Sequence, residues 1–232
     1  MRTLLKMRLP LTLFMLLILA LCGAGGVIFY SVFAAHAQGD YLRIETDHLE
    51  IEFPKNGFVS FGDQENFSGT IHVAAVYPSD IRASMIIRIF DEDAAERYLM
   101  QERIDDGSSA NLVELRRLYN WVLQRNENAT LSFIENGTME LFDYNADFTI
   151  ILIGGYVDNL GNYYSNCTWK FTSFIVTSFT GSRKVIQVFY FGIEKDYETT
   201  DDLFEDMIEA RIRLKEQYSE TVGFEASRDN HD

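Results

Sequence analysis

The sequence predicts an α+β domain in which an antiparallel sheet of six to seven strands is flanked by three helices, as an α/β/α sandwich, preceded by one N-terminal transmembrane helix. Two patterns predict the domain: closely spaced β-rich runs after residue 40, and three segments with apolar residues at helical spacing. One long uncharged stretch predicts the membrane helix. With 232 residues, 47% of them hydrophobic, the chain is long enough to bury a core.

The N-terminal segment has the pattern of a membrane anchor. Arg2, Lys6 and Arg8 precede an uncharged stretch of 27 residues, 9–35, which exceeds the roughly 20 residues that a helix needs to cross a bilayer. By the positive-inside rule, residues 1–8 stay in the cytoplasm and the remainder is delivered outside. The chain is therefore expected to be a single-pass membrane protein.

A secretory signal cut after Ala37 is the alternative to an anchor, because the small residues of Ala35-His36-Ala37 fit a peptidase site. The apolar region of a cleavable signal usually spans only about 7–15 residues, which favours the anchor. In either case residues 36–218 are expected to form the extracytoplasmic domain, and residues 219–232 a disordered acidic tail.

Strand-like alternation of apolar and acidic residues begins at 42–53, and Pro54 is expected to end this strand because proline cannot donate a ladder hydrogen bond. The Asn136-Gly137 pair inside 131–144 predicts a hairpin turn at that point. Further β-rich runs predict strands at 70–77, 84–90, 148–157, 163–174 and 184–192.

Three helices are expected around the sheet. The first begins near Asp93, which forms a capping-box pattern with Glu96. The second carries apolar residues at three- and four-residue spacing over 112–122, with Asn111 and Glu114 at its cap and 105–109 as the preceding loop. The third is an amphipathic stripe over 204–212, capped by Thr200.

The order of these parts resembles the PsbP-like fold family over most of residues 41–215. The resemblance implies an α/β/α sandwich that acts as an accessory or binding module, with no catalytic residues to carry over. Nothing in the chain resembles the N-terminal extension by which the family's photosystem subunit docks, so no photosynthetic role is expected. The resemblance is carried by "IEFPKNGF" (51–58), "SMIIRIF" (84–90), "FIENGTMEL" (133–141), "KVIQVFYFG" (184–192) and "LFEDMIEARIRL" (203–214).

Charge restricts the partners. The whole chain carries −15, and because the N-terminal tip contributes +3, about −18 falls on the exported part. Such a balance repels phosphate backbones, so no nucleic-acid partner is expected. Acidic blocks such as Asp91-Glu92-Asp93 leave calcium binding as a minor alternative, and no other cofactor is expected.

No catalytic or metal site is predicted. His48 and His72, the two histidines of the domain, lie on different expected strands without ligand spacing, which argues against zinc. Ser60 departs from the G-x-S-x-G nucleophile pattern, and phosphate-binding glycine motifs are absent. Since Cys22 lies in the membrane segment, Cys167 has no cysteine to pair with and is expected to be buried.

Two sets of residues are candidate surface sites. Four N-x-S/T sequons are candidates for N-glycosylation, at Asn66, Asn128, Asn136 and Asn166. The late strands carry aromatics on both faces, so either both faces are buried or one docks a partner. The candidate partner-binding aromatics are Tyr163, Tyr164, Trp169 and Tyr190.

These patterns together predict a membrane-tethered, non-enzymatic extracytoplasmic module that binds a protein partner or a small ligand. Two other classes stay open: an exported or anchored hydrolase-type enzyme that uses surface carboxylates, and a divalent-cation-binding domain. A deep pocket with convergent acids would indicate the enzyme, whereas a flat apolar patch would indicate the binding module.

Overall fold

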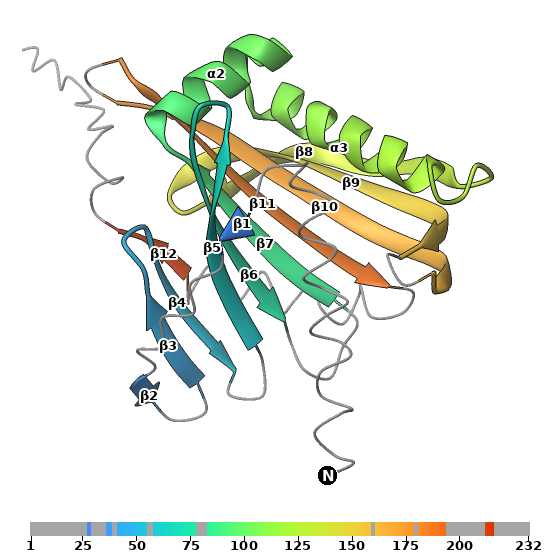
Figure 1. The fold of residues 1–232 in the computed structure, drawn as a ribbon, viewed down its shortest axis with the longest axis horizontal. Helices are drawn as coiled ribbons and strands as arrows, with labels where there is room; N and C mark the ends of the chain where they lie inside the picture. The colour runs from blue at the N-terminus through green and yellow to red at the C-terminus, as the bar shows by residue number, and fades with distance from the viewer. Residues whose placement is uncertain are drawn as a thin grey trace, which may run out of the picture.

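The computed structural model describes residues 27–28, 36–38, 41–54, 58–77, 83–158, 161–178, 181–193 and 212–215. Within them the chain is mostly β-structure, with an eight-stranded and a four-stranded antiparallel sheet and two helices (Figure 1). The predicted fold, a single six- to seven-stranded sheet between three helices, is therefore wrong.

The larger sheet joins two meanders, in the order β1-β5-β6-β7-β11-β10-β9-β8. β5, β6 and β7 form one meander and β8 to β11 the other, and the two meet where β7 pairs with β11, with Ile87 opposite Val188. The strands are β1 Val27–Ile28, β5 Phe58–Asn66, β6 Gly69–Tyr77, β7 Ala83–Phe90, β8 Thr130–Leu141, β9 Tyr144–Val157, β10 Tyr163–Thr177 and β11 Arg183–Ile193.

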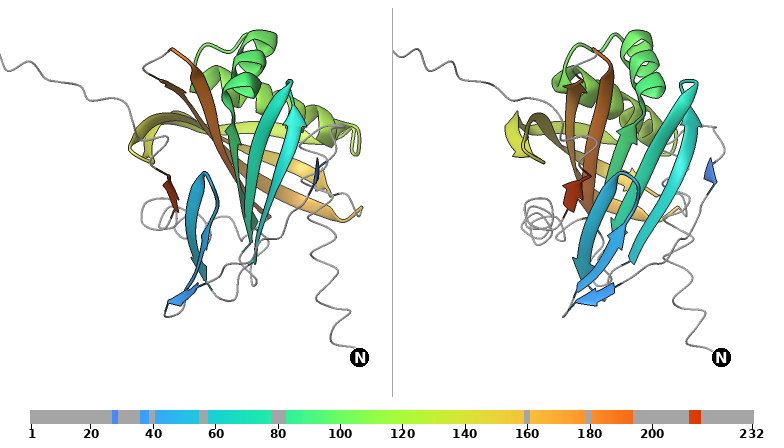
Figure 2. Two further views of the ribbon diagram at one scale, coloured as in Figure 1. Left: turned by 60° about the vertical axis from the view of Figure 1, so that its left-hand side comes forward. Right: turned by 90° about the vertical axis from the view of Figure 1, so that its left-hand side faces the viewer.

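Two helices, α2 (Glu92–Glu102) and α3 (Gly107–Leu123), connect β7 to β8 and cover one face of the larger sheet (Figure 2). α2 begins after Asp91, whose Oδ1 accepts a hydrogen bond from Ala94 N at 2.7 Å. α3 begins after Asp106, which forms a capping box with Ser109. Both helices start earlier than predicted, because these aspartates satisfy the first free N–H groups ahead of the expected caps.

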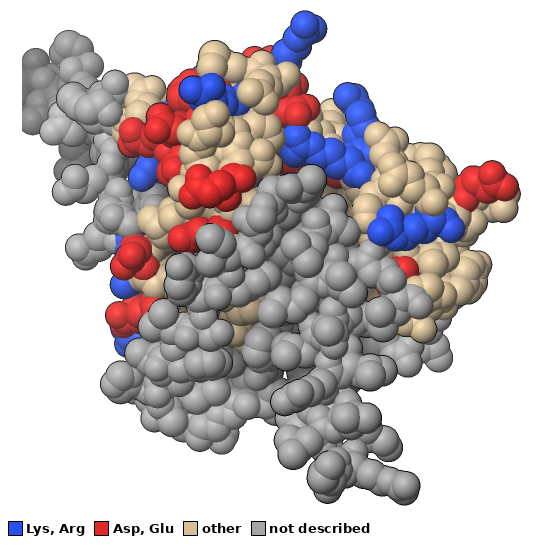
Figure 3. Space-filling model, in the orientation of Figure 1, with Lys and Arg blue, Asp and Glu red and all other residues tan. Residues whose placement is uncertain are grey.

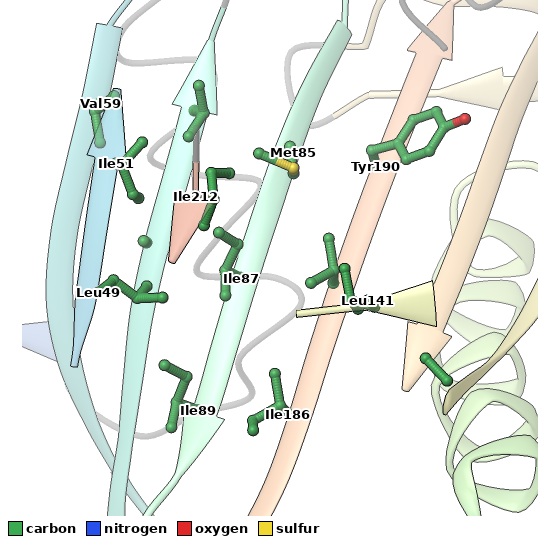
Figure 4. Packing of buried hydrophobic residues seen from close by; sticks show 14 of the residues in the cluster. Leu49, Ile51, Val59, Met85, Ile87, Ile89, Leu141, Ile186, Tyr190 and Ile212 are labelled. Atoms are coloured by element: carbon green, nitrogen blue, oxygen red, sulfur yellow. The ribbon is translucent and has the colours of Figure 1, made fainter. Parts of the chain in front are cut away.

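The smaller sheet covers the opposite face of the larger one. Its order is β12-β4-β3-β2, with β2 His36–Gln38, β3 Tyr41–Glu45, β4 Leu49–Pro54 and β12 Ile212–Leu214. Ile51 and Ile212 lie against Met85 and Ile87 of β7 in one apolar cluster (Figure 4). Alternate residues of β7 point to the helices instead, so this central strand is buried on both faces.

The first expected strand is two strands joined by a tight turn. Thr46 Oγ1 accepts hydrogen bonds from the N–H groups of His48 and Leu49, at 3.2 and 2.9 Å, which reverses the chain between β3 and β4. Pro54 is the last residue of β4, as predicted. The strand β5, which the sequence did not predict, begins four residues later.

The predicted hairpin turn at Asn136-Gly137 is also wrong, because both residues lie within β8. The chain reverses at Phe142 and Asp143, which have φ values of 54° and 66°. Gly137 lies opposite Phe148 of β9, and a Cβ on Gly137 would come within 3.1 Å of that ring. The glycine thus makes room for a neighbouring aromatic side chain rather than forming a turn.

The strands predicted at 70–77, 84–90 and 184–192 are confirmed, as is the hairpin of 148–157 with 163–174. Most of the expected membrane segment 9–35 lies outside the described residues, as does most of the expected helix 204–212. The described parts of both are extended, since Val27–Ile28 is β1 and Ile212 begins β12. Neither described helix combines the length and apolar character that spanning a bilayer requires.

The first turn of α3 lies so close to β10 that Gly107 has no room for a side chain. A Cβ there would collide with the backbone oxygen of Ser173 and the carboxylate of Asp147. We expect Gly107→Ala to lower the free energy of unfolding by about 2–3 kcal/mol, the range for overpacking a close contact. Urea denaturation of the full chain in detergent, followed by circular dichroism, measures this.

Ser108→Ala is the control for Gly107→Ala, because Ser108 is exposed in the same turn and uses its backbone N–H, not its side chain, to bind Asp147. Its expected effect is within about 0.5 kcal/mol. Equal unfolding midpoints for both variants would contradict the close approach of α3 to β10.

Candidate functional site

The candidate aromatic residues are split between the core and the surface. Trp169 and Tyr190 are buried, and Trp169 stacks on Phe191 with ring centroids 4.6 Å apart. Tyr164 is half-buried, and its hydroxyl donates to Asp158 Oδ2 at 3.1 Å. Only Tyr163, 66% exposed, presents a ring to solvent. These placements match the alternative in which both faces of the sheet are covered.

The candidate glycosylation residues lie mostly on the surface. Asn128, Asn136 and Asn166 are exposed, whereas Asn66 is half-buried and its Oδ1 accepts a hydrogen bond from Phe67 N at 2.8 Å. Asn128 lies in the connection from α3 to β8, and Asn136 lies within β8. Two of the exposed sequons therefore flank or occupy the same strand.

A cluster of charged and polar side chains is buried between the helices and the larger sheet. Glu114 of α3 accepts hydrogen bonds from Arg88 Nη1 at 3.1 Å, from the Tyr98 hydroxyl at 2.9 Å and from Arg117 Nη1 at 2.8 Å. Gln187 Nε2 donates to the Tyr98 hydroxyl at 3.3 Å. The cluster thus joins α2, α3, β7 and β11.

The interior of this cluster is closed to solvent. Arg88 and Glu114 are 3% and 4% exposed, and the guanidinium of Arg88 lies over the rings of Phe90 and Phe189. Burial, together with the charge of Glu114, raises the pKa of Tyr98 far above its ordinary value. These hydrogen bonds tie the two helices to the larger sheet.

Sequence reasoning missed a pair of histidines whose rings are in tilted contact where the two sheets meet. His48 in the β3–β4 turn lies on His72 of β6, with ring centroids 3.7 Å apart, and His72 Nδ1 is 2.8 Å from Asp63 Oδ1. Burial, and then the proximity of His72, lowers the pKa of His48 to about 4. A turn and a strand 24 positions apart carry no spacing signal, so only the packing of the two sheets shows this pair.

The described residues contain no three His, Cys, Asp or Glu side chains arranged to hold a metal ion. Asp91, in one of the acidic blocks, uses its two carboxylate oxygens to accept from Ala94 N and Thr70 N. Cys167 is buried, as expected, and burial raises the pKa of its thiol well above the ordinary value. A thiol held protonated in this way is a poor nucleophile.

A shallow depression opens at the C-terminal end of α2. Two arginines, Arg103 and Arg183, contribute to its lining. Arg183 donates two hydrogen bonds to Glu96, at 2.9 and 2.8 Å, so its charge is already compensated. On the face viewed in Figure 3, acidic and basic side chains are interspersed over the helical layer, which gives no single-sign surface there.

The strand β8, at one end of the larger sheet, is largely exposed. Nine of its twelve residues are exposed, and its hydrogen-bonded neighbour within the described part of the chain is β9 alone. A bulge between Phe133 and Glu135 interrupts the pairing, and there Phe133 and Ile134 are 59% and 56% exposed. Adjacent exposed apolar side chains on an edge strand are typical of a binding surface.

The class of protein defined by these features is a mostly-β, two-sheet domain with a closed interior and an open sheet edge. No family model matches the chain and no curated protein matches it, so the resemblance to the PsbP-like family is not confirmed. A solved structure with some likeness is LpqN of Mycobacterium tuberculosis, described as involved in cell envelope biogenesis. It is 10% identical over 72% of this chain and 82% of its own, with a TM-score of 0.34, which assigns neither fold nor role.

Removing one partner of the buried ion pair is expected to destabilise the protein strongly. Glu114→Leu leaves the buried charge of Arg88 uncompensated, which typically costs about 3–5 kcal/mol of unfolding free energy. The double variant Arg88→Met with Glu114→Leu removes both charges and should recover most of that loss. Chemical denaturation of the full chain measures both effects.

Glu96→Leu is the matched control, because it removes a helical glutamate that pairs with Arg183 near the surface. Its expected cost is within about 1 kcal/mol. If the double variant were as unstable as Glu114→Leu alone, or if Glu96→Leu cost as much as Glu114→Leu, the importance assigned to the buried charge would be refuted.

The histidine pair makes stability depend on pH. Because the pKa of His48 is about 4 in the folded state and about 6.5 in an unfolded chain, only the unfolded chain binds this proton between these values. The free energy of unfolding should thus fall as pH drops from about 6.5 to 4, by about 1–2 kcal/mol after allowing for solvent around the partly exposed ring. Denaturation midpoints across this pH range measure the slope.

His48→Asn should flatten the dependence of the unfolding free energy on pH. His231→Asn, the same change outside the described residues, should leave this dependence unchanged. Four neighbours also act on His48: His72 and Lys184 lower its pKa, and Asp47 and Asp63 raise it. Identical slopes for His48→Asn and the unchanged chain would rule out His48 as the group responsible.

Proposed function

We propose that this chain is a non-enzymatic binding module, held on the outer side of a membrane by the apolar N-terminal residues that precede β1, that binds a partner protein. The proposal combines an anchor inferred from the sequence with a binding surface inferred from the fold. Its chemistry is recognition, not turnover.

The observation that supports binding is the exposed edge of β8. The side chains of Phe133 and Ile134 are exposed there, at one end of a sheet whose central strand β7 is buried on both faces. Arg88 and Glu114, by contrast, are buried beneath the helices. Recognition at the edge therefore accounts for the exposed groups better than chemistry in the interior does.

The charge pattern of the N-terminus supports the membrane location. Three cations precede 27 uncharged residues, and the first acidic residue is Asp40. Such a segment is retained in a bilayer with its basic end in the cytoplasm. The binding domain would then lie outside, close to the membrane surface.

Fractionation of cells that produce the full chain with a C-terminal tag tests the location. We expect the protein in the membrane pellet after alkaline carbonate washing, with the tag open to protease added from outside. Leu16→Lys with Leu19→Lys should release it, because each lysine at the centre of a membrane helix costs about 2.5–3.5 kcal/mol. Leu16→Ile with Leu19→Ile is the matched control and should stay in the pellet.

A carbonate-soluble full chain, or a tag protected from external protease in intact cells, would refute the membrane-anchored external location. The apparent mass in each fraction also reports whether the segment before Gln38 is removed. A shortened chain that leaves the membrane would replace the anchor with a cleaved signal.

A further inference from the structure

We propose that the edge of β8 takes an extended, basic segment of a partner protein as an added strand of the larger sheet. The inference rests on the proposed binding role and adds the chemistry of the partner. It follows from the backbone geometry of β8, from its lack of protective residues and from its charge.

The side of β8 that faces away from β9 carries backbone groups with the geometry to pair with another strand. From Thr130 to Leu141 the strand is paired with β9 on one side, so alternate backbone N–H and C=O groups point away from the sheet along its other side. Twelve residues give an edge about 40 Å long. A peptide in extended conformation satisfies a row of such groups, and this is the usual way in which a free sheet edge binds a partner.

Two common devices that protect an edge strand are missing from β8. It contains no proline and no lysine, the two residue types that most often prevent pairing at an edge. Its one irregularity is the bulge between Phe133 and Glu135. Beyond the bulge, the register from Asn136 to Leu141 is continuous and leaves six regular positions for pairing.

Charge indicates what kind of strand would pair there. β8 carries Glu135 and Glu140 and no basic residue. Met139 and Leu141 face the core beside the smaller sheet, so Glu140 points to the other face of the sheet, whereas Glu135 shares the face of Met139. A partner strand with basic residues on both faces therefore meets a carboxylate on each.

The same charges disfavour a second copy of this chain. Two β8 strands would bring four glutamates and no cation to one edge, between molecules that each carry −15. The exposed side chains of Phe133 and Ile134 add apolar contact area at one end of the edge. The preferred partner is thus an extended segment of mixed basic and β-branched composition.

Peptide binding to the purified full chain in detergent tests the proposal. The probe is a ten-residue peptide, (Lys-Val-Thr)3-Lys, whose three-residue period places lysines alternately on both faces of a strand. The protein is made in a host that adds no N-glycans, because Asn136 lies on β8. We expect binding together with slower amide hydrogen exchange confined to 130–141, and at least tenfold weaker binding when glutamate replaces lysine in the peptide.

Two variants separate pairing at β8 from general attraction to an acidic protein. Glu135→Lys with Glu140→Lys should weaken binding of the lysine peptide at least tenfold and favour the glutamate peptide. Glu65→Lys with Asp105→Lys changes the net charge equally at exposed positions away from β8 and should leave the preference unchanged. N-methylation of alternate peptide amides, which keeps the charge and removes donors, should abolish binding.

Several outcomes would overturn strand addition at β8. Equal weakening in both charge-reversed variants, or undiminished binding of the N-methylated peptide, would show that charge alone attracts the probe. Exchange protection outside β8 would place the site elsewhere. Dimerisation of the free chain that itself protects 130–141 would assign the edge to a second copy. Because these assays use purified protein, they are independent of the membrane location tested by fractionation.

Discussion

The buried carboxylate of Glu114 is the constraint on which the arrangement of helices and sheet depends. It is 4% exposed, so its oxygens need hydrogen-bond donors from the protein, and these come from Arg88 on β7, Tyr98 on α2 and Arg117 on α3. Apolar packing alone would tolerate a helix shifted by one turn on the sheet. The shared carboxylate does not, because a shift would leave a charge unpaired.

This cluster also lies where the two halves of the larger sheet meet. Arg88 and Gln187 lie opposite each other in the pairing of β7 with β11. Arg88 donates a hydrogen bond to Glu114, and Gln187 donates one to the Tyr98 hydroxyl. The next residue across the sheet is Ser173 of β10, whose backbone oxygen lies against Gly107 at the start of α3. A row of polar groups beneath the helices therefore fixes their position.

Local patterns in the sequence anticipated individual elements better than their assembly. Alternation and turn residues correctly indicated β7, β9, β10 and β11, because these strands are long and their turns are polar. The hairpin at Phe142-Asp143 was missed because neither residue is a glycine, although both adopt positive φ. The residues Asn136 and Gly137 were misleading because that glycine accommodates a ring on the next strand.

The candidate site, like the fold, could be predicted from the sequence only in its local features. That the aromatics of β10 and β11 occupy both faces could be inferred from alternation, but whether helices or a second sheet covers each face depends on contacts between distant segments. The contact between His48 and His72 and the terminal place of β8 among the described strands likewise arise only when strands remote in sequence are placed side by side. No periodicity in a single sequence encodes which strand becomes the last in a sheet.

The pairing of β7 with β11 has a consequence for how the chain reaches its fold. Ile89 and Ile186 are opposite each other in the finished sheet yet are separated by almost a hundred residues of chain. Closing so long a loop is entropically costly and slow, whereas the two meanders form from near neighbours. Each half should therefore assemble first. Until the two halves pair, the unpaired edges of β7 and β11 are exposed and can associate with other incompletely folded chains. Rapid pairing of β7 with β11 therefore limits association between such intermediates.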